Sequence, residues 1–410
     1  PELVRRYARQ DIEETRRLAD LVLPPEFYQA QMISESYQSC ATGGTGEKIN
    51  SLLVREYLRQ GHAIPQPQPP QACPGGYTQL CESGVLHRVV KADVESLYPS
   101  IMLRYGIRPA SDRLEIFLPL LEELTGRRLE AKANARRRGP RAAYWDGLQS
   151  SFKVLINSFY GYLGAPFNFN DYQAATQITT TGRQLVQEVA AELERTGSRV
   201  IEIDTDGVYF VPPKDVEGEA AEVAYVQRVG AVLPEGIRLA HDGRYAVMVS
   251  LKTKNYVLVG YDGKRIYRGA SLRSRAEEAY GREFLARAID ALIAGDPEAL
   301  HRTYETLAHQ ITHGELPLDQ FVRRERVTEK TLHSEAKKRS RAAARSSRVG
   351  ETLLVYQRQD GTLAPAQAYA HDEDRWYYLD KLYRFATRLK EALGPEFQRL
   401  CPKPTRKRLE

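Results

Sequence analysis

Two segments of this sequence carry aspartates at the end of, or in a turn within, apolar runs typical of buried strands. The first, 91–100, holds Asp93, and the second, 201–210, holds Asp204 and Asp206. Carboxylates in such places are costly to desolvate and repel one another unless a cation compensates them. Mg²⁺ takes oxygen ligands, and a pair of such ions can promote an in-line phosphoryl displacement. The simpler alternative is that the second segment is only a hairpin turn, because Asp-Gly is a strong turn signal.

Between them, a third segment is typical of a helix with a chemical face. Four of its residues share that face, at positions i, i+4, i+7 and i+8: Lys153, Asn157, Tyr160 and Gly161. Earlier in the chain, Arg128 and Lys132 form an i, i+4 pair. If the two helices are antiparallel, three cations face one volume, where they would neutralise a triphosphate. Tyr160 and Gly161 would leave a flat platform for a base. The alternative is an ordinary helical hairpin with solvated cations.

Composition narrows the class of protein. The chain has 410 residues, a formal charge of +6 and 42% hydrophobic residues, and no apolar run approaches the length needed to span a bilayer. Lys and Arg cluster within 127–141 and 337–348, which suits a polyanionic partner; the alternative for either run is a solvated helix face or a flexible loop. The four cysteines form no CxxC pair, so we expect reduced thiols and a cytoplasmic location, nucleoid-associated if the source is prokaryotic. Because position 1 is not Met, we expect part of a longer protein.

The period of the apolar residues and the positions of Pro and Gly indicate where helices and strands begin and end. Residues 11–20 have helical spacing and should stop near Pro24-Pro25, and a second helix is expected over 48–60, before a proline-rich linker at 64–70. Further helices are expected at 116–138, 141–165 and 172–196; a hairpin is expected within 244–269; and the chain from about 276 should be mostly helical. The fold class is therefore α+β: one antiparallel sheet that bears the acids, with helical insertions and a helical C-terminal lobe.

Taken together, the three segments resemble the polymerase part of a family B DNA polymerase. The stretch Asp93-x-x-Ser-Leu-Tyr-Pro-Ser-Ile101 is similar to motif A of that family, 153–161 to motif B, and Asp204-Thr-Asp-Gly207 to motif C. Residues 252–256 resemble the strand that contacts the primer end, and 374–394 resemble the thumb helix. Gly75-Gly76 resembles the linker motif before the palm, although Cys73 stands where that motif usually has Tyr.

The resemblance implies a role for each matching residue. Asp93, Asp206 and the carbonyl of Val94 would hold two Mg²⁺ ions, with Mn²⁺ as a substitute, and Asp204 would be a supporting acid. Lys153 would also protonate the pyrophosphate, and Tyr98 would exclude a 2′-hydroxyl. The residues expected to bind the incoming nucleotide are Val94, Ser96, Leu97, Tyr98, Arg128, Lys132, Lys153, Asn157, Tyr160 and Gly161. Those expected to bind DNA are Lys252, Lys254, Tyr256, Lys337, Lys338, Arg339 and Arg341.

The implied architecture is a right hand, with an antiparallel-sheet palm, two-helix fingers and a mostly helical thumb. Its expected parts are a palm at 66–115 and 166–275, fingers at 116–165, and a thumb at 276–410. Residues 1–65 would be a linker and a remnant of an exonuclease or N-terminal region. Within that remnant, Tyr7-Ala-Arg-Gln-Asp11 fits the last exonuclease motif, and there is no room upstream for the others, so we expect no proofreading by this chain.

The function implied is template-directed addition of deoxynucleotides to a primer 3′-hydroxyl by two-metal-ion nucleotidyl transfer. The expected partners are primer–template DNA and deoxynucleoside triphosphates, with no membrane; we expect a monomer, and accessory replication factors are not identified. One alternative is a relative that binds DNA without catalysis, against which the intact aspartates argue. Another is a different nucleotidyl transferase, one that needs no template or that copies RNA.

Besides Cys73, two residues in and beside motif C depart from the family pattern. Gly207 stands where motif C often has Ser, a change from which little effect is expected. Glu202 stands where many relatives have an aromatic residue. Strand alternation would put Glu202, Asp204 and Asp206 on the same side, where Glu202 could alter metal affinity; otherwise it faces away.

Overall fold

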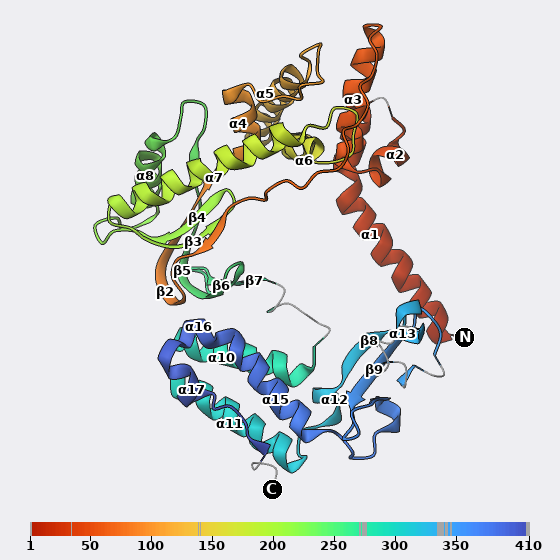
Figure 1. Cartoon of the computed structure of the whole chain (residues 1–410), viewed down its shortest axis with the longest axis vertical. Helices are drawn as coiled ribbons and strands as arrows, with labels where there is room; N and C mark the ends of the chain where they lie inside the picture. Colours follow the sequence, from red (N-terminus) through yellow and green to blue (C-terminus); the bar gives the residue numbers. More distant parts are fainter. Residues whose placement is uncertain are drawn as a thin grey trace.

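The structure is a computed structural model of the chain. It describes residues 2–33, 35–137, 139, 141–269, 272, 277–333, 340, 343–344 and 347–406. Figure 1 shows a sheet, a helical hairpin, a long N-terminal helix and a C-terminal lobe arranged around an open centre. Among the described residues, no helix is long and apolar enough to span a membrane. The α+β class expected from the sequence is confirmed.

A seven-stranded antiparallel sheet carries all three aspartates. Its strand order is β1-β3-β4-β2-β5-β6-β7, and its strands are β1 (Thr78–Leu80), β2 (Gly84–Val94), β3 (Arg199–Asp204), β4 (Gly207–Val211), β5 (Leu239–Lys252), β6 (Asn255–Val259) and β7 (Arg265–Arg268). The central pairing of β2 with β4 sets Asp93 opposite Gly207. Sequence segments more than a hundred residues apart are thereby joined at the ends of two central strands of the sheet.

Helices cover one face of this sheet. Helix α7 (Tyr172–Arg195) packs its apolar stripe, including Val186 and Val189, against Val200 and Phe210 of the strands. Asp171 caps the start of α7 by accepting hydrogen bonds from the N–H groups of residues 173 and 174. Helix α8 (Glu219–Val229) joins the same core, and α4 (Leu97–Tyr105) follows β2 directly. The opposite face forms a smaller cluster that contains Tyr209 and Tyr256.

The helical hairpin expected as fingers is present. Helices α5 (Phe117–Arg136) and α6 (Ala142–Leu163) lie within a few residues of the expected ranges. Their contact contains the buried rings of Phe117, Phe159 and Tyr162. The hairpin packs on α4, so the cations of α5 are carried beside the segment that follows Asp93.

The N-terminal segment corrects one expectation. Helix α1 runs over Glu2–Met32, straight through Pro24 and Pro25, where the sequence predicted an end. Tertiary contacts explain the difference: Ser151 of α6 donates a hydrogen bond to the Pro25 carbonyl at 2.7 Å, and the buried Lys48 ammonium donates to Gln29 at 2.7 Å. The short α2 (Tyr37–Thr42) and α3 (Thr45–Arg59) then lead to the proline-rich linker.

The C-terminal lobe is helical but also contains a sheet that the sequence did not predict. Its helices are α10 (Ala279–Ala294), α11 (Pro297–His313), α12 (Leu318–Phe321), α13 (Glu329–His333), α15 (Arg375–Ala386), α16 (Lys390–Leu393) and α17 (Phe397–Leu400). Strands β8 (Arg323–Arg326), β9 (Thr352–Gln357) and β10 (Leu363–Pro365) form an antiparallel sheet in the order β10-β9-β8. The lobe has its own apolar core, around Tyr280, Phe284 and Leu382.

Candidate active site

The backbone brings the aspartates together at the end of β2 and the β3–β4 turn. The N–H of Val94 donates a 2.7 Å hydrogen bond to the carbonyl of Asp206, which fixes the two segments against each other. Asp204 ends β3, and the turn residue Thr205 has a left-handed φ of 58°. The linker holds that turn, because the N–H of Thr205 donates to the Tyr77 carbonyl at 2.7 Å. The segment 204–207 is therefore a hairpin turn, as the simpler alternative holds, and it also carries acids into the site.

Gly207 lies so close to the Asp93 carboxylate that no space is left for a side chain at position 207. A Cβ added there would lie 2.6 Å from Asp93 Oδ1 and 3.1 Å from the carbonyl oxygen of Ala92. Any side chain at 207 therefore has to displace the Asp93 carboxylate. From the sequence, little effect is expected of Gly207, whereas the structure shows that the absence of a side chain there makes room for the Asp93 carboxylate.

Lys91 lies between two carboxylates, and the sequence reasoning did not assign it to the site. Its Nζ is 3.3 Å from Asp93 Oδ1 and 2.6 Å from Asp242 Oδ2. Lys91 stands two residues before Asp93 on β2, so alternation along a strand could have placed both on one side. Asp242 on β5 gave no comparable signal, because only the β2–β5 pairing brings it near.

Burial dominates the electrostatics of the aspartates. Burial first, and then the nearby Asp206 charge, raise the pKa of Asp93 to about 6, although Lys91 partly offsets them. Burial also raises the pKa of Asp206, which Lys91 partly offsets. Burial lowers the pKa of Lys91, but Asp242 and Asp93 outweigh it and raise the pKa above its ordinary value. The charges of these acids are thus partly compensated by the protein's own Lys91.

Asp204 is compensated by a different lysine. Lys254 Nζ lies 3.0 Å from Asp204 Oδ1. Lys254 sits in the turn between β5 and β6 with a left-handed φ of 59°. Its backbone N–H donates a 2.6 Å hydrogen bond to Oε1 of the fully buried Glu202. Glu202 and Asp204 therefore reach the same residue and lie on the same side, as alternation predicted.

On the side toward the fingers, aromatic rings and glycines shape the surface. The rings of Tyr98 and Tyr160 meet with centroids 4.4 Å apart at a tilt of 42°. The Tyr98 hydroxyl would lie 3.0 Å from a Cβ at Gly76, and its ring edge 3.1 Å from one at Gly182. Tyr98 is thus held among the linker, α6 and α7. The platform expected from Tyr160 and Gly161 is partly occupied by Tyr98, while Gly161 itself is exposed.

The predicted phosphate-binding cations come from both finger helices. Arg128 Nη1 donates a 3.2 Å hydrogen bond to Oγ of Ser96, so α5 is tied to the segment after Asp93. Lys132 is half-buried on the same helix, and Lys153 and Asn157 are exposed on α6. Leu97 is buried at the start of α4 and packs in the apolar core. Its neighbours Ser96 and Tyr98 are therefore the polar groups of this segment.

The predicted DNA-binding residues divide into three groups. Lys252 and Lys254 are exposed at the β5–β6 turn. Tyr256 is a correction: its side chain is only 4% exposed and its hydroxyl is hydrogen-bonded to Tyr209 at 3.0 Å, so it supports the turn from within the core and offers no free face to DNA. The basic residues Lys337, Lys338, Arg339 and Arg341 lie outside the described residues.

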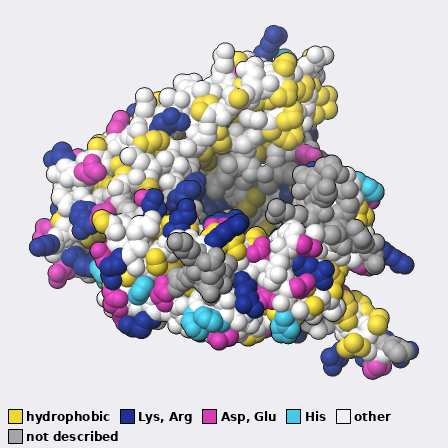
Figure 2. All heavy atoms as spheres, turned by 60° about the horizontal axis from the view of Figure 1, so that its bottom comes forward, with side chains coloured by type: hydrophobic (Ala, Val, Ile, Leu, Met, Phe, Trp, Pro, Cys, Tyr) yellow, Lys and Arg dark blue, Asp and Glu magenta, His cyan; other side chains and the backbone are white. Residues whose placement is uncertain are grey.

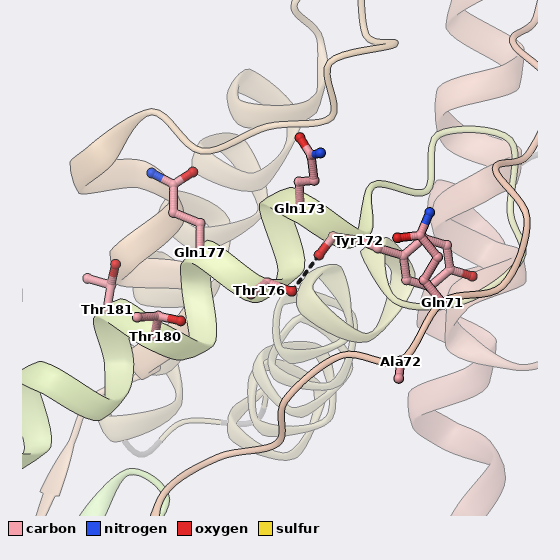
Figure 3. Close-up of a pocket in the computed structure, with 8 residues that line it drawn as sticks. All are labelled: Gln71, Ala72, Tyr172, Gln173, Thr176, Gln177, Thr180 and Thr181. Atoms are coloured by element: carbon pink, nitrogen blue, oxygen red, sulfur yellow. Dashed lines mark hydrogen bonds between the residues drawn. The ribbon is translucent and has the colours of Figure 1, made fainter.

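A groove lies at the other end of the linker. It has a volume of about 390 Å³ and lies between Gln71-Ala72 and α7. Figure 3 shows the uncharged side chains of Gln173, Thr176 and Gln177 along its helical wall. From Ala72 the linker continues to Gly76 and Tyr77, which contact Tyr98 and the aspartate turn. Figure 2 shows a wider hollow in the molecule, with Lys and Arg side chains along part of its rim.

The donor set fits Mg²⁺ held jointly with a substrate. Asp93 Oδ1 is buried, and no donor among the described residues meets it in hydrogen-bond geometry. Across the same residues, no three Asp, Glu, His or Cys side chains form a metal site. Mg²⁺ is usually bound through one or two carboxylates plus phosphate oxygens and water.

The sheet with its aspartates and the facing helical hairpin define the right-hand class of polymerase folds. The family model of DNA polymerase family B matches residues 108–348, more than half of the chain. The chain therefore belongs to DNA polymerase family B. The matched range includes Arg128, Lys153 and the Asp204–Asp206 turn and begins after Asp93.

Individual relatives agree with this. DNA polymerase 1 of Pyrococcus abyssi is 25% identical over 356 residues, covering 78% of this chain and 46% of that protein. A DNA polymerase of Pyrococcus glycovorans is 25% identical over 447 residues, covering 96% and 57%. The structure of the family B DNA polymerase from Pyrobaculum calidifontis matches the fold with a TM-score of 0.73 at 19% identity, over 95% of this chain and 56% of that one. The chain spans about half the length of the curated relatives it matches.

Proposed function

We propose that this chain is a DNA-directed DNA polymerase that adds deoxynucleotides to a primer 3′-hydroxyl. The proposal rests on one observation, the junction at which the segments that contain Asp93 and Asp206 are in contact. The backbone hydrogen bond from Val94 to Asp206 fixes it, and the chain continues from Asp93 to Ser96, which accepts a hydrogen bond from Arg128, and to Tyr98, which contacts Tyr160. Acids on one side and phosphate-binding cations on the other suit nucleotidyl transfer from a triphosphate.

The two aspartates, with the Val94 carbonyl, would hold Mg²⁺. When bound, two such ions supply a more acidic primer hydroxyl and charge neutralisation on the triphosphate. Asp204 would support the site from the primer side while it stays paired with Lys254. Mn²⁺ would serve as a substitute because it accepts the same oxygen ligands.

The finger helices would hold the nucleotide. Arg128, Lys132 and Lys153 would bind its phosphates, and Lys153 would donate a proton to the departing pyrophosphate. Asn157, Tyr160 and Gly161 would border the base, and Ser96 would orient Arg128. Tyr98 would lie against the sugar and leave no room for a 2′-hydroxyl.

Duplex DNA would be held by charge and the template by hydrogen bonds. Lys252 and Lys254 would contact the primer backbone, and the basic run 337–341 would follow duplex phosphates, which makes binding salt-dependent. We propose that the template strand passes along the groove between Gln71 and α7. Its wall carries no carboxylate among the lining residues, and the linker joins it to Tyr98.

We also infer three properties of the chain as given. It would extend a primer without removing mismatched ends, because a two-metal exonuclease needs several carboxylates and only the Tyr7–Asp11 pair resembles such a motif. It would act as a monomer. Its place of action would be the cytoplasm, at the nucleoid in a prokaryote.

Primer extension tests the proposal. The assay uses a labelled primer on a DNA template with Mg²⁺ and all four deoxynucleotides, and compares wild type with Asp206→Asn and with Asp215→Asn, an exposed aspartate in the turn after β4. We expect template-directed products from wild type and Asp215→Asn, and none from Asp206→Asn, with primer–template affinity retained. Failure of wild type to extend while it binds tightly would favour a DNA-binding protein without catalysis. Products that ignore the template would favour the other transferase.

A further inference from the structure

Glu202 is a buried acid beside the active site that the proposed mechanism does not use. Its side chain is completely buried in β3, two residues before Asp204. A carboxylate in such a place costs stability unless hydrogen bonds compensate it. Only one of its oxygens is compensated within the described residues, because Oε2 is buried without a hydrogen-bond partner. The stability of the fold alone therefore does not explain why a glutamate occupies this buried position.

A β-bulge directs the Glu202 side chain. The β3–β4 register passes from Val200 opposite Phe210 to Glu202 opposite Tyr209, so Ile201 is the extra residue. Bulges re-aim side chains next to active sites. Here the bulge brings Glu202 Oε1 to 2.6 Å from the backbone N–H of Lys254.

Lys254 needs such support. Its backbone has a φ of 59°, in the left-handed region that is unfavourable for a residue with a Cβ. The β5–β6 register is also irregular here, between Ser250 and Lys252. A carboxyl oxygen that accepts a hydrogen bond from its N–H favours this turn over other conformations. The same residue extends its ammonium group to Asp204 at 3.0 Å, so one turn conformation sets the position of a cation at the acid site.

We propose that Glu202 is a positioning residue for the primer-binding turn, which it holds through the Lys254 N–H so that the Lys254 ammonium stands at Asp204. The reference to primer rests on the proposed function, whereas the contact between Glu202 and the turn does not. Glu202 touches neither substrate nor reacting atoms and acts only through Lys254.

Primer–template affinity tests the functional part. Glu202→Met removes the acceptor and keeps a side chain of similar length, and Glu202→Gln keeps an acceptor oxygen at the same place. We expect Glu202→Met to raise the primer–template Kd about tenfold, equivalent to ~1.4 kcal/mol, and Glu202→Gln to stay close to wild type. The KM for the nucleotide should not change, because the residues proposed to bind it lie within 94–98 and on α5 and α6, not on this turn.

A double-mutant cycle separates positioning from general structural support. If Glu202 acts through the Lys254 ammonium, Glu202→Met causes no further loss of affinity when Lys254 is already Ala. An equal loss in both backgrounds would overturn the proposal, and so would a Glu202→Gln variant as weak as Glu202→Met. Melting temperatures of all variants, measured alongside, identify those that have lost the fold.

Hydrogen–deuterium exchange tests the contact without any activity. Glu202→Met should accelerate exchange in the peptide 252–256, and Glu202→Gln should not. Unchanged exchange in Glu202→Met would show that the carboxylate does not hold the turn, and the inference would fall. If wild type neither binds nor extends a primer, the proposed function fails, and the exchange result still decides whether Glu202 holds the turn.

Discussion

Replacing Asp93 by Asn should stabilise the metal-free protein at neutral pH. Burial raises the pKa of this carboxyl in the folded state, so the folded protein binds its proton more tightly than the unfolded chain does. Stability contributed by the protonated form is present at low pH and is lost as the pH rises through the folded pKa. Asparagine has no charge to bury and therefore avoids the loss.

The magnitude follows from the pKa. A rise from 3.8 to about 6 is roughly 2 units, which at about 1.4 kcal/mol a unit gives an upper value of ~3 kcal/mol. The side chain is 28% exposed and Lys91 keeps its 2.6 Å contact with Asp242, so solvent and the remaining ion pair reduce the net gain. We therefore expect about 1–3 kcal/mol in the free energy of unfolding at pH 8, and close to none at pH 4.

Thermal and urea unfolding in EDTA at pH 4, 6 and 8 measures this difference, with Asp215→Asn as the control for loss of an exposed carboxylate. The gain should develop between pH 4 and 7 in Asp93→Asn and be absent from the control. Added Mg²⁺ should stabilise wild type more than Asp93→Asn, since the variant loses a ligand. An Asp93→Asn protein that is less stable than wild type at pH 8 in EDTA would refute the claim that burial dominates this site.

Three further substitutions test the geometry. Gly207→Ala should push the Asp93 carboxylate aside, because its Cβ would lie 2.6 Å from Oδ1; we expect the extension rate to fall by up to about 100-fold with the melting temperature nearly kept. A rate close to wild type would contradict the close approach. Tyr98→Ala should admit ribonucleotides in single-nucleotide insertion assays while Tyr98→Phe still rejects them; unchanged discrimination in the alanine variant would remove the proposed steric role. Gln177→Glu puts a charge in the groove and should weaken primer–template binding severalfold in anisotropy titrations at low salt. Gln187→Glu, on an exposed part of the same helix, should not, and equal effects would place the template elsewhere.

Much of the fold follows from local patterns. Helices α5, α6 and α7 match their expected ranges within a few residues, because the sequence at 138–140 separates the first two and α7 has a regular apolar period. The C-terminal sheet could not be expected in the same way, since β8 reads Arg-Arg-Glu-Arg and has no apolar alternation. The end expected for α1 near Pro24 was wrong because contacts with α3 and α6 override the proline signal.

The sequence indicates which residues could form the candidate site, but it does not indicate which of them are in contact. The motif residues identified the acids and Arg128, whereas the pairing of Lys91 with Asp242 depends on strand register across about 150 residues. Likewise, Tyr256 looked like a DNA contact in the sequence, and only the packing of β6 shows it buried against Tyr209. The bulge at Ile201 has no signal in composition or period.

Lys91 and Lys254 compensate the charges of the three aspartates unequally, so the aspartates need not have the same role. Asp204 is engaged by the Lys254 ammonium at 3.0 Å, so the protein already compensates its charge. Asp93 shares Lys91 with Asp242, and the Lys91 Nζ is closer to Asp242 Oδ2, at 2.6 Å, than to Asp93 Oδ1, at 3.3 Å, whereas no ion pair of Asp206 is found among the described residues. A cation with oxygen ligands is drawn to carboxylates whose charge is least satisfied. This pattern supports the proposal that Asp93 and Asp206 are the Mg²⁺ ligands and that Asp204, together with Lys254, lies on the primer side.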